Sequence, residues 1–231
     1  MSAAVDEDGG GVGGGQVPGL DEPAWRREAL RVSDRYLREV VVDFGLCPWA
    51  EHAITGGEVR RRVVLDGAPT VDAALAFIDE LAGAGAAAAV GMLIFPRAAL
   101  APPAFDRYTE QVRRADRERC RAAGRKDFVM AAFHPETSSS FETPYQLVSF
   151  LRRAPDPMIQ LVRAESLDHV RAARPSLSDD IARQNFATVT ARGAAALEAI
   201  LRDIRRDRDG SYAALAASGP PPAVTAATPR G

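Results

Sequence analysis

Four short apolar runs, each separated from the next by a stretch with helical spacing, constrain the fold more than any other feature. They occupy residues 59–65, 88–96, 128–135 and 158–163. Runs of this length are typical of strands, and the continuous run AAVGMLIFP at 88–96 indicates a strand covered on both faces. Strands that alternate with helices favour a sheet with helices packed on it. The sequence therefore predicts a single mixed α/β domain, with a short sheet of about four strands.

Caps and apolar spacing predict the helices between these runs. Asp21 is a good N-cap and Pro23 suits a first turn, so a helix is expected from there to Phe44–Gly45. Thr143-Pro144-Tyr145-Gln146 is a capping-box pattern that predicts a helix to about Arg153. Apolar residues three and four apart predict one long final helix over 178–204. Further helices are expected from Pro48 to Gly56, from Thr70, over 102–120 and over 166–173.

The two ends of the chain have a different composition from the middle. Residues 1–20 are rich in glycine and residues 209–231 are rich in proline and alanine. Segments with so few large apolar residues bury too little surface to offset the entropy lost on ordering. We therefore expect a disordered tail at each end and one ordered domain over residues 21–208.

Charge and cysteine content exclude several classes of protein. The formal net charge is −2, so no excess of basic residues indicates binding to nucleic acid. No apolar run approaches the ~20 residues that span a bilayer, and the acidic, glycine-rich start is unlike a signal peptide. Cys47 and Cys120 are too few for a disulfide framework. A cytoplasmic protein without a membrane partner is expected; the sequence leaves both the cofactor and the oligomeric state open.

Cys47 lies in the stretch GLCPWAEH, directly before a proline. If Pro48 is the first residue of a helix, Cys47 is the N-cap of that helix. Backbone N–H groups and the helix dipole at such a position favour a thiolate, which is the reactive form of cysteine. The alternative is that Cys47 packs beneath the loop as a small apolar side chain.

His134 follows a predicted buried strand and precedes Pro135, which forces the chain to turn. Ligands of open α/β sheets collect beyond the carboxyl ends of strands, where a histidine can act as general base or metal ligand. Glu136 is close enough in sequence to orient the imidazole. The alternative is a histidine that hydrogen-bonds a loop carbonyl and fixes the turn.

Three further polar positions are candidates for ligand contacts. Arg153, next to Arg152 at the end of a predicted helix, has the fork of donors that binds carboxylate or phosphate. Asn185 lies near the start of the final helix, and residues 137–140 form a polar loop. The alternatives are a solvated helix end for Arg153, a polar helix surface for Asn185 and an ordinary loop for residues 137–140.

Four motifs occur in a fixed order: GLCPWA, AAFHP, a Pro-x-Pro turn running into MIQLVRAESL, and RQNFATV. Together they resemble the bacterial domain of unknown function family 1415, from about Trp25 to Arg192. The resemblance implies a compact bacterial-type cytoplasmic domain with no assigned reaction, and it implies that Cys47 and His134 belong to one site. Relatives tend to have a histidine where this chain has Gln160, so the resemblance implies an altered or inactive site here if that position bears chemistry in the family. A glutamine at that position can still hydrogen-bond a ligand.

Three functional hypotheses follow. The leading one is a small-molecule enzyme with Cys47 as nucleophile or redox centre, His134 as acid/base and Glu136 orienting the ring. Substrate contacts would then come from Arg153, Gln160 and Asn185. The second hypothesis is a metal-dependent enzyme that uses Cys47, His134 and Glu136 as ligands, although none of them has a recognised zinc spacing. The third is a non-catalytic binding or scaffold domain.

Overall fold

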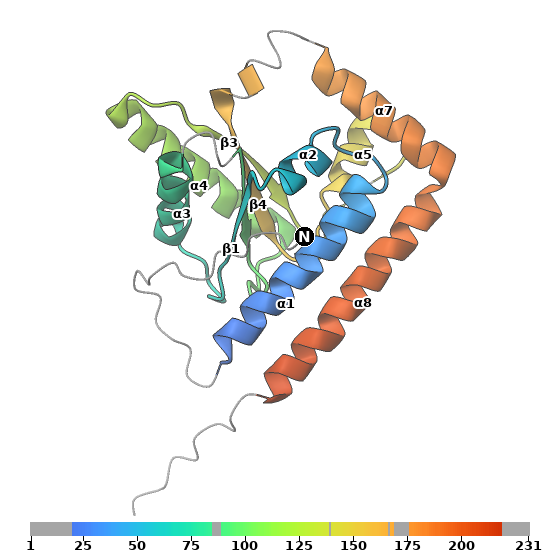
Figure 1. Ribbon diagram of the computed structural model, residues 1–231, viewed down its shortest axis with the longest axis horizontal. Coiled ribbons are helices and arrows are strands. Elements are labelled where there is room, and N and C mark those ends of the chain that lie inside the picture. Colours follow the sequence, from blue (N-terminus) through green and yellow to red (C-terminus); the bar gives the residue numbers. More distant parts are fainter. Residues whose placement is uncertain (1–19, 85–88, 139, 166, 169–175, 219–231) are drawn as a thin grey trace, which may run out of the picture.

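A four-stranded sheet between two layers of helices forms the body of the protein (Figure 1). The computed structural model describes residues 20–84, 89–138, 140–165, 167–168 and 176–218. The predicted single α/β domain is confirmed. The expected tails at 1–19 and 219–231, and most of the helix expected over 166–173, lie outside the described residues.

The strands are β1 (Val59–Val63), β2 (Val90–Ile94), β3 (Phe128–Phe133) and β4 (Met158–Arg163). Their order in the sheet is β1-β2-β4-β3, with β1 parallel to β2 and β4 antiparallel to both of its neighbours. All four predicted strands are therefore present, although β1, β2 and β3 end one or more residues before the predicted limits. The register aligns the last residues of β1, β2 and β3 with the first residue of β4, so these four strand ends share one edge of the sheet.

One face of the sheet is covered by α3 (Val71–Gly83) and α4 (Pro102–Ala123). Alternate strand residues point toward these helices, as the pleat of a strand requires. Leu93, Ile159 and Leu161 are examples, and each is fully buried among apolar residues of α3 and α4.

The other face is covered by a larger group of helices. These are α1 (Glu22–Arg35), the π-helix η1 (Tyr36–Val42), α5 (Pro144–Leu151), α7 (Leu177–Arg192) and α8 (Ala194–Ser218). In Figure 1, α1 and α8 lie side by side, and the rings of Trp25 and Tyr212 pack with their centroids 4.8 Å apart. The short helix α2 (Ala50–Thr55) links η1 to β1.

The predicted caps at Asp21 and Thr143 are confirmed. The Asp21 carboxylate accepts a hydrogen bond from the backbone N–H of Ala24 at 3.0 Å, which satisfies one of the free donors of the first turn. Thr143 Oγ1 accepts in the same way from the N–H of Gln146 at 3.3 Å. The first helix continues as η1 and ends before Gly45, whose φ of 64° suits glycine.

The long final helix was predicted wrongly in two respects. It is interrupted at Gly193, where φ is 90° and ψ is 118°, a conformation outside the helical region. It also extends beyond the expected domain boundary at residue 208, because α8 runs to Ser218 and Tyr212 is buried against α1. The apolar spacing correctly predicts helix on both sides of Gly193, but such spacing does not show that a single glycine interrupts the helix.

Candidate functional site

Cys47 lies between η1 and α2, and it is not a helix N-cap. Helix α2 begins at Ala50 with Trp49 as its N-cap, because Pro48 and Trp49 form a turn. The carbonyl of Cys47 accepts the N–H of Ala50 at 3.2 Å across this turn. The expected stabilisation of a thiolate by the first turn of a helix therefore does not apply. The Cys47 side chain is partly exposed.

The loop that carries Cys47 is held from α7. Asn185 is buried, and its Nδ2 donates to the carbonyl oxygen of Leu46 at 2.9 Å. Arg192 donates to the carbonyl of Asp43 and stacks on the ring of Phe44, 4.3 Å from its centroid. The Asn185 amide, expected as a substrate contact, thus fixes the backbone beside Cys47.

His134 uses both ring nitrogens to bind main chain. The N–H of Glu136 donates to Nδ1 at 3.1 Å, so Nδ1 carries no proton. Nε2 therefore carries it and donates to the carbonyl oxygen of Leu100 at 2.8 Å. The side chain is only 5% exposed and packs on Phe105. This geometry matches the alternative interpretation, a histidine that fixes the turn, and it leaves neither nitrogen available as a general base.

The structure does not bring Cys47 and His134 together. Leu46 packs with the helices on the α1 side of the sheet, whereas the His134 ring contacts Phe105 on the α4 side. Helix α2 leads into the first residue of β1, while His134 follows the last residue of β3, at the opposite edge of the sheet. No hydrogen bond joins Cys47 to His134 or Glu136 within the described part of the chain.

The ligand set of the metal hypothesis is not assembled either. Among the described residues, no three His, Cys, Asp or Glu side chains lie close enough together to hold a metal ion. Glu136 is exposed, and it contacts His134 through its backbone N–H and not through its carboxylate.

Gln160 occupies the middle of β4, where it pairs with Met92 of β2 and Ala131 of β3. Its chain neighbours Ile159 and Leu161 pack toward α3 and α4, so Gln160 faces the α1 side. It shares that face with the Cys47 loop and not with the His134 ring.

Arg153 does converge with a second cation that the sequence interpretation missed. Arg153 Nε donates to the carbonyl oxygen of Pro135 at 3.5 Å, and Arg205 Nη2 donates to the same oxygen at 2.5 Å. The Arg153 guanidinium also lies 5.3 Å from the ring centroid of Phe150, which limits its orientation. We call these two side chains, with the Pro135 carbonyl between them, the Arg153–Arg205 site.

Neither arginine is bonded to a carboxylate in the part of the chain that the structure describes. No carboxylate in the described ranges forms a hydrogen bond or ion pair with either guanidinium, and Arg205 Nε is buried without any hydrogen-bond partner. Burial, followed by repulsion from Arg153, lowers the pKa of Arg205. Buried donors are normally satisfied, so this arrangement has an unmet demand for acceptors.

His134 contributes to this site indirectly. By binding Leu100 and Glu136 it holds the turn that presents the Pro135 carbonyl to the two arginines. The N–H of His134 also donates to the carbonyl of Arg152 at 2.9 Å, which joins the turn to the segment carrying Arg153.

A buried ion pair beside the site also escaped the sequence interpretation. Asp156, in the turn between two prolines, accepts Arg208 Nε at 2.7 Å and the Tyr212 hydroxyl at 2.8 Å. Burial raises the pKa of Asp156, against the attraction of Arg208 and the hydrogen bonds that it accepts. One signal was present in the sequence. Arg208 continues the buried stripe formed by Leu197, Leu201 and Ile204, and an arginine on such a stripe is largely covered and needs a partner.

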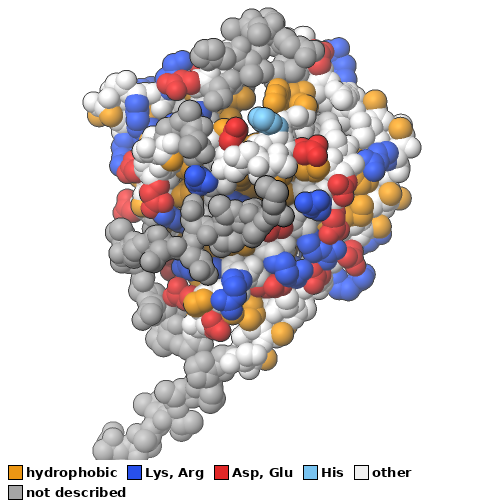
Figure 2. All heavy atoms as spheres, in the orientation of Figure 1, with side chains coloured by type: hydrophobic (Ala, Val, Ile, Leu, Met, Phe, Trp, Pro, Cys, Tyr) orange, Lys and Arg blue, Asp and Glu red, His pale blue; other side chains and the backbone are white. Residues whose placement is uncertain are grey.

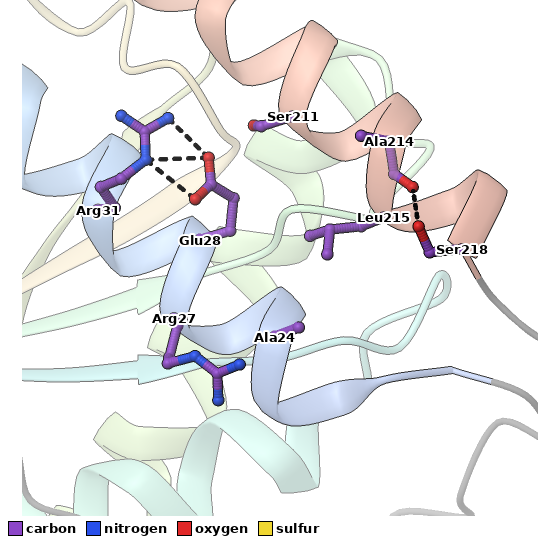
Figure 3. Close-up of a pocket in the computed structure, with 8 residues that line it drawn as sticks. All are labelled: Ala24, Arg27, Glu28, Arg31, Ser211, Ala214, Leu215 and Ser218. Carbon is purple, nitrogen blue, oxygen red and sulfur yellow. Dashed lines mark hydrogen bonds and ion pairs between the residues drawn. The ribbon is translucent and has the colours of Figure 1, made fainter.

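A shallow groove of about 540 Å³ lies elsewhere, between α1 and α8 (Figure 3). Within it, Arg31 pairs with Glu28 of its own helix, and the walls are otherwise mostly small side chains of α8. None of the six predicted site residues lines this groove. Its residues are Ala24, Arg27, Glu28, Arg31, Ser211, Ala214, Leu215 and Ser218.

A comparison with known protein families gives a match to the middle of the chain. A family described as "Protein of unknown function (DUF1415)" matches residues 28–199. The chain belongs to the DUF1415 family. This match confirms the resemblance drawn from the four motifs. The matched region contains Cys47, His134, Arg153, Gln160 and Asn185, and it ends before Arg205. Searches of curated proteins and of solved structures found no significant match to this DUF1415 protein. Among the described helices, none is both long and apolar enough to cross a membrane.

Proposed function

We propose that this DUF1415 protein binds a small anionic molecule at the Arg153–Arg205 site. The observation that carries the proposal is the convergence of two guanidinium groups on one carbonyl oxygen, with no carboxylate bonded to either in the described residues. Two cations held together repel each other, and the repulsion is relieved when an anion binds to both of them beside the Pro135 carbonyl. Guanidinium groups are well suited to carboxylate and phosphate oxygens.

The position of the site supports the same proposal. It lies beyond the sheet edge at which β3 ends and β4 begins, and such edges commonly hold ligands in α/β folds. The turn at Pro135 is fixed by His134, and the Arg153 loop is fixed by Asp156, so both sides are already ordered before a ligand arrives. Ordered groups lose less entropy on binding.

The test is a thermal-shift and calorimetric titration with phosphate, sulfate and succinate at constant ionic strength, using chloride as the reference. An anion that binds at this site should raise the melting temperature of the native protein. Arg205→Gln and Arg153→Gln should each weaken binding by about tenfold or more, the usual loss when a charge-assisted hydrogen bond is removed.

Arg206→Gln is the matched control, because Arg206 is an exposed arginine on the same helix. It should leave the affinity unchanged. Equal affinities in the native protein, Arg205→Gln and Arg153→Gln would contradict the proposal.

As a second proposal, Cys47 is a reactive thiol that works without His134. Its side chain is partly exposed, and its Sγ forms no hydrogen bond to any described residue. Cys120 is the opposite case: it is buried and hydrogen-bonded to Asp116. The nucleophilic or redox role that the sequence predicts for Cys47 therefore stays a proposal, and His134 takes no part in it.

We also propose a cytoplasmic location and no nucleic-acid partner. Both cysteines are free, in keeping with a reducing compartment. Basic and acidic side chains are intermixed over α1 and α8 on the face shown in Figure 2, which does not suit the uniform charge of a phosphate backbone.

A further inference from the structure

We infer that the group bound at the Arg153–Arg205 site is the phosphate of a small phosphate monoester. The inference rests on the proposed function, which requires only an anion, and it names the class of that anion. Three features favour phosphate over a carboxylate: the arrangement of donors, the balance of charge and the hydroxyl-bearing residues that follow the Pro135 turn in the chain.

The donors come from two different parts of the fold. Arg153 lies in the loop between α5 and β4, and Arg205 lies on α8. Because both bind the Pro135 oxygen, their donating nitrogens are separated by no more than the sum of those two hydrogen-bond lengths. A planar carboxylate is matched by one guanidinium fork, whereas a phosphate has three terminal oxygens and can accept from two forks at once.

The charge at the site also fits a dianion. Arg208 is already paired with Asp156 and Asp209, so it adds little uncompensated charge. Arg153 and Arg205 remain; Asp209 and, more weakly, Glu136 attract Arg205, but neither forms an ion pair with it. A phosphate monoester carries about −1.5 to −2 at pH 7, which compensates both guanidinium groups, whereas a single carboxylate compensates one.

Hydroxyl groups follow the same turn. Thr137 and Ser138 come directly after Glu136, and Thr137 is anchored by its N–H, which donates to the His134 carbonyl at 3.1 Å. Neither hydroxyl forms a hydrogen bond to a described residue. Hydroxyl donors combine readily with arginine in binding phosphate oxygens.

The experiment is calorimetry on the full chain with glycerol 3-phosphate, inorganic phosphate, sulfate and succinate. We expect glycerol 3-phosphate to bind about tenfold more tightly than succinate, because the two charges of succinate lie on separate carboxylate groups and only one group can occupy the site. Its affinity relative to sulfate should fall between about pH 7.5 and about pH 5.5, because the second ionisation of a phosphate monoester lies near pH 6 and sulfate stays a dianion. Taking the ratio to sulfate removes any titration of the protein itself.

Variants separate this inference from the proposed function. Succinate binding as tightly as glycerol 3-phosphate, with both lost in Arg205→Gln, would overturn the phosphate assignment and leave anion binding intact. An absence of binding by all four anions would overturn both. If Arg205→Gln fails to fold by circular dichroism, Arg153→Gln decides in the same way, because Arg153 is itself partly exposed.

Discussion

Asp156 and Arg208 form an ion pair of 2.7 Å between Oδ1 and Nε, and this pair ties the loop of Arg153 to the helix of Arg205. Asp156 is 2% exposed and its second oxygen accepts the Tyr212 hydroxyl. The pairing of Arg208 with Asp156 therefore fixes the spacing of Arg153 and Arg205, the two arginines proposed to bind an anion.

Asp156→Asn should lower the free energy of unfolding by about 3 kcal/mol, because it leaves the largely covered Arg208 guanidinium without its main counter-charge. Urea unfolding followed by circular dichroism measures this loss. The double variant Asp156→Asn/Arg208→Gln should be more stable than the sum of the single losses predicts, since it removes both charges. Additive losses would show that the ion pair contributes no coupling.

Iodoacetamide should alkylate Cys47 in the native protein and leave Cys120 unmodified until the protein unfolds. The reason is access: Cys47 is partly exposed, whereas Cys120 is buried behind Asp116. Mass spectrometry of the two peptides after timed exposure measures both rates in one sample. Protection of Cys47 to the same degree as Cys120 would remove the reactive-thiol proposal.

Stability should fall in mildly alkaline solution because of Cys120. Burial, together with the hydrogen bond to Asp116, raises the pKa of the Cys120 thiol to about 11. An unfolded thiol loses its proton near pH 8.5, so the folded state holds the proton more tightly. This contribution is complete below about pH 8.5 and is lost as the pH rises to about 11. Urea unfolding from pH 8 to 10 should show a shallower decline in Cys120→Ala, and parallel curves would contradict the assignment.

Cys47→Ser and His134→Ala should act independently. His134→Ala leaves the Leu100 carbonyl and the Glu136 N–H without partners, at a cost of about 2 kcal/mol. Because no hydrogen bond joins the two side chains and they belong to opposite ends of the sheet, the loss in the double variant should equal the sum of the single losses within about 0.5 kcal/mol. Coupling well above this value would restore the idea of a shared site.

Two glycines of the last helices form a matched pair for substitution. Gly193→Ala should destabilise by about 1 kcal/mol or more, because its φ of 90° is unfavourable for any residue with a Cβ. Gly210→Ala should stabilise by up to about 1 kcal/mol, because Gly210 lies within α8 and nothing is within 4 Å of an added Cβ. Thermal unfolding measures the shift in melting temperature of each variant. Shifts of the same sign in the two variants would contradict the interruption of the helix at Gly193.

The fold was largely predictable because its signals are local. Strand β4 coincides with the predicted run 158–163, and the caps at Asp21 and Thr143 act as their side chains suggest. The break at Gly193 was missed because a glycine is tolerated within an apolar helical pattern, and only its dihedral angles show the interruption.

The candidate site was less predictable because it depends on long-range contacts. Arg153 was recognised as a donor, but its companion Arg205 comes from a helix far along the chain, and no spacing in the sequence relates them. His134 was recognised as important at the end of β3. Its neutral form, with both nitrogens bound to main chain, depends on Leu100, a residue from a different loop.

The packing of α1 against α8 has a consequence for synthesis of the protein. Helix α1 is the first described element to leave the ribosome and α8 is the last, yet Trp25 of one packs on Tyr212 of the other. The apolar face of α1 therefore stays without its α8 contacts until all four strands of the sheet have been synthesised. At typical elongation rates of about 5–20 residues per second, that interval lasts on the order of ten seconds or more. During this time the nascent chain exposes a surface that a chaperone would recognise.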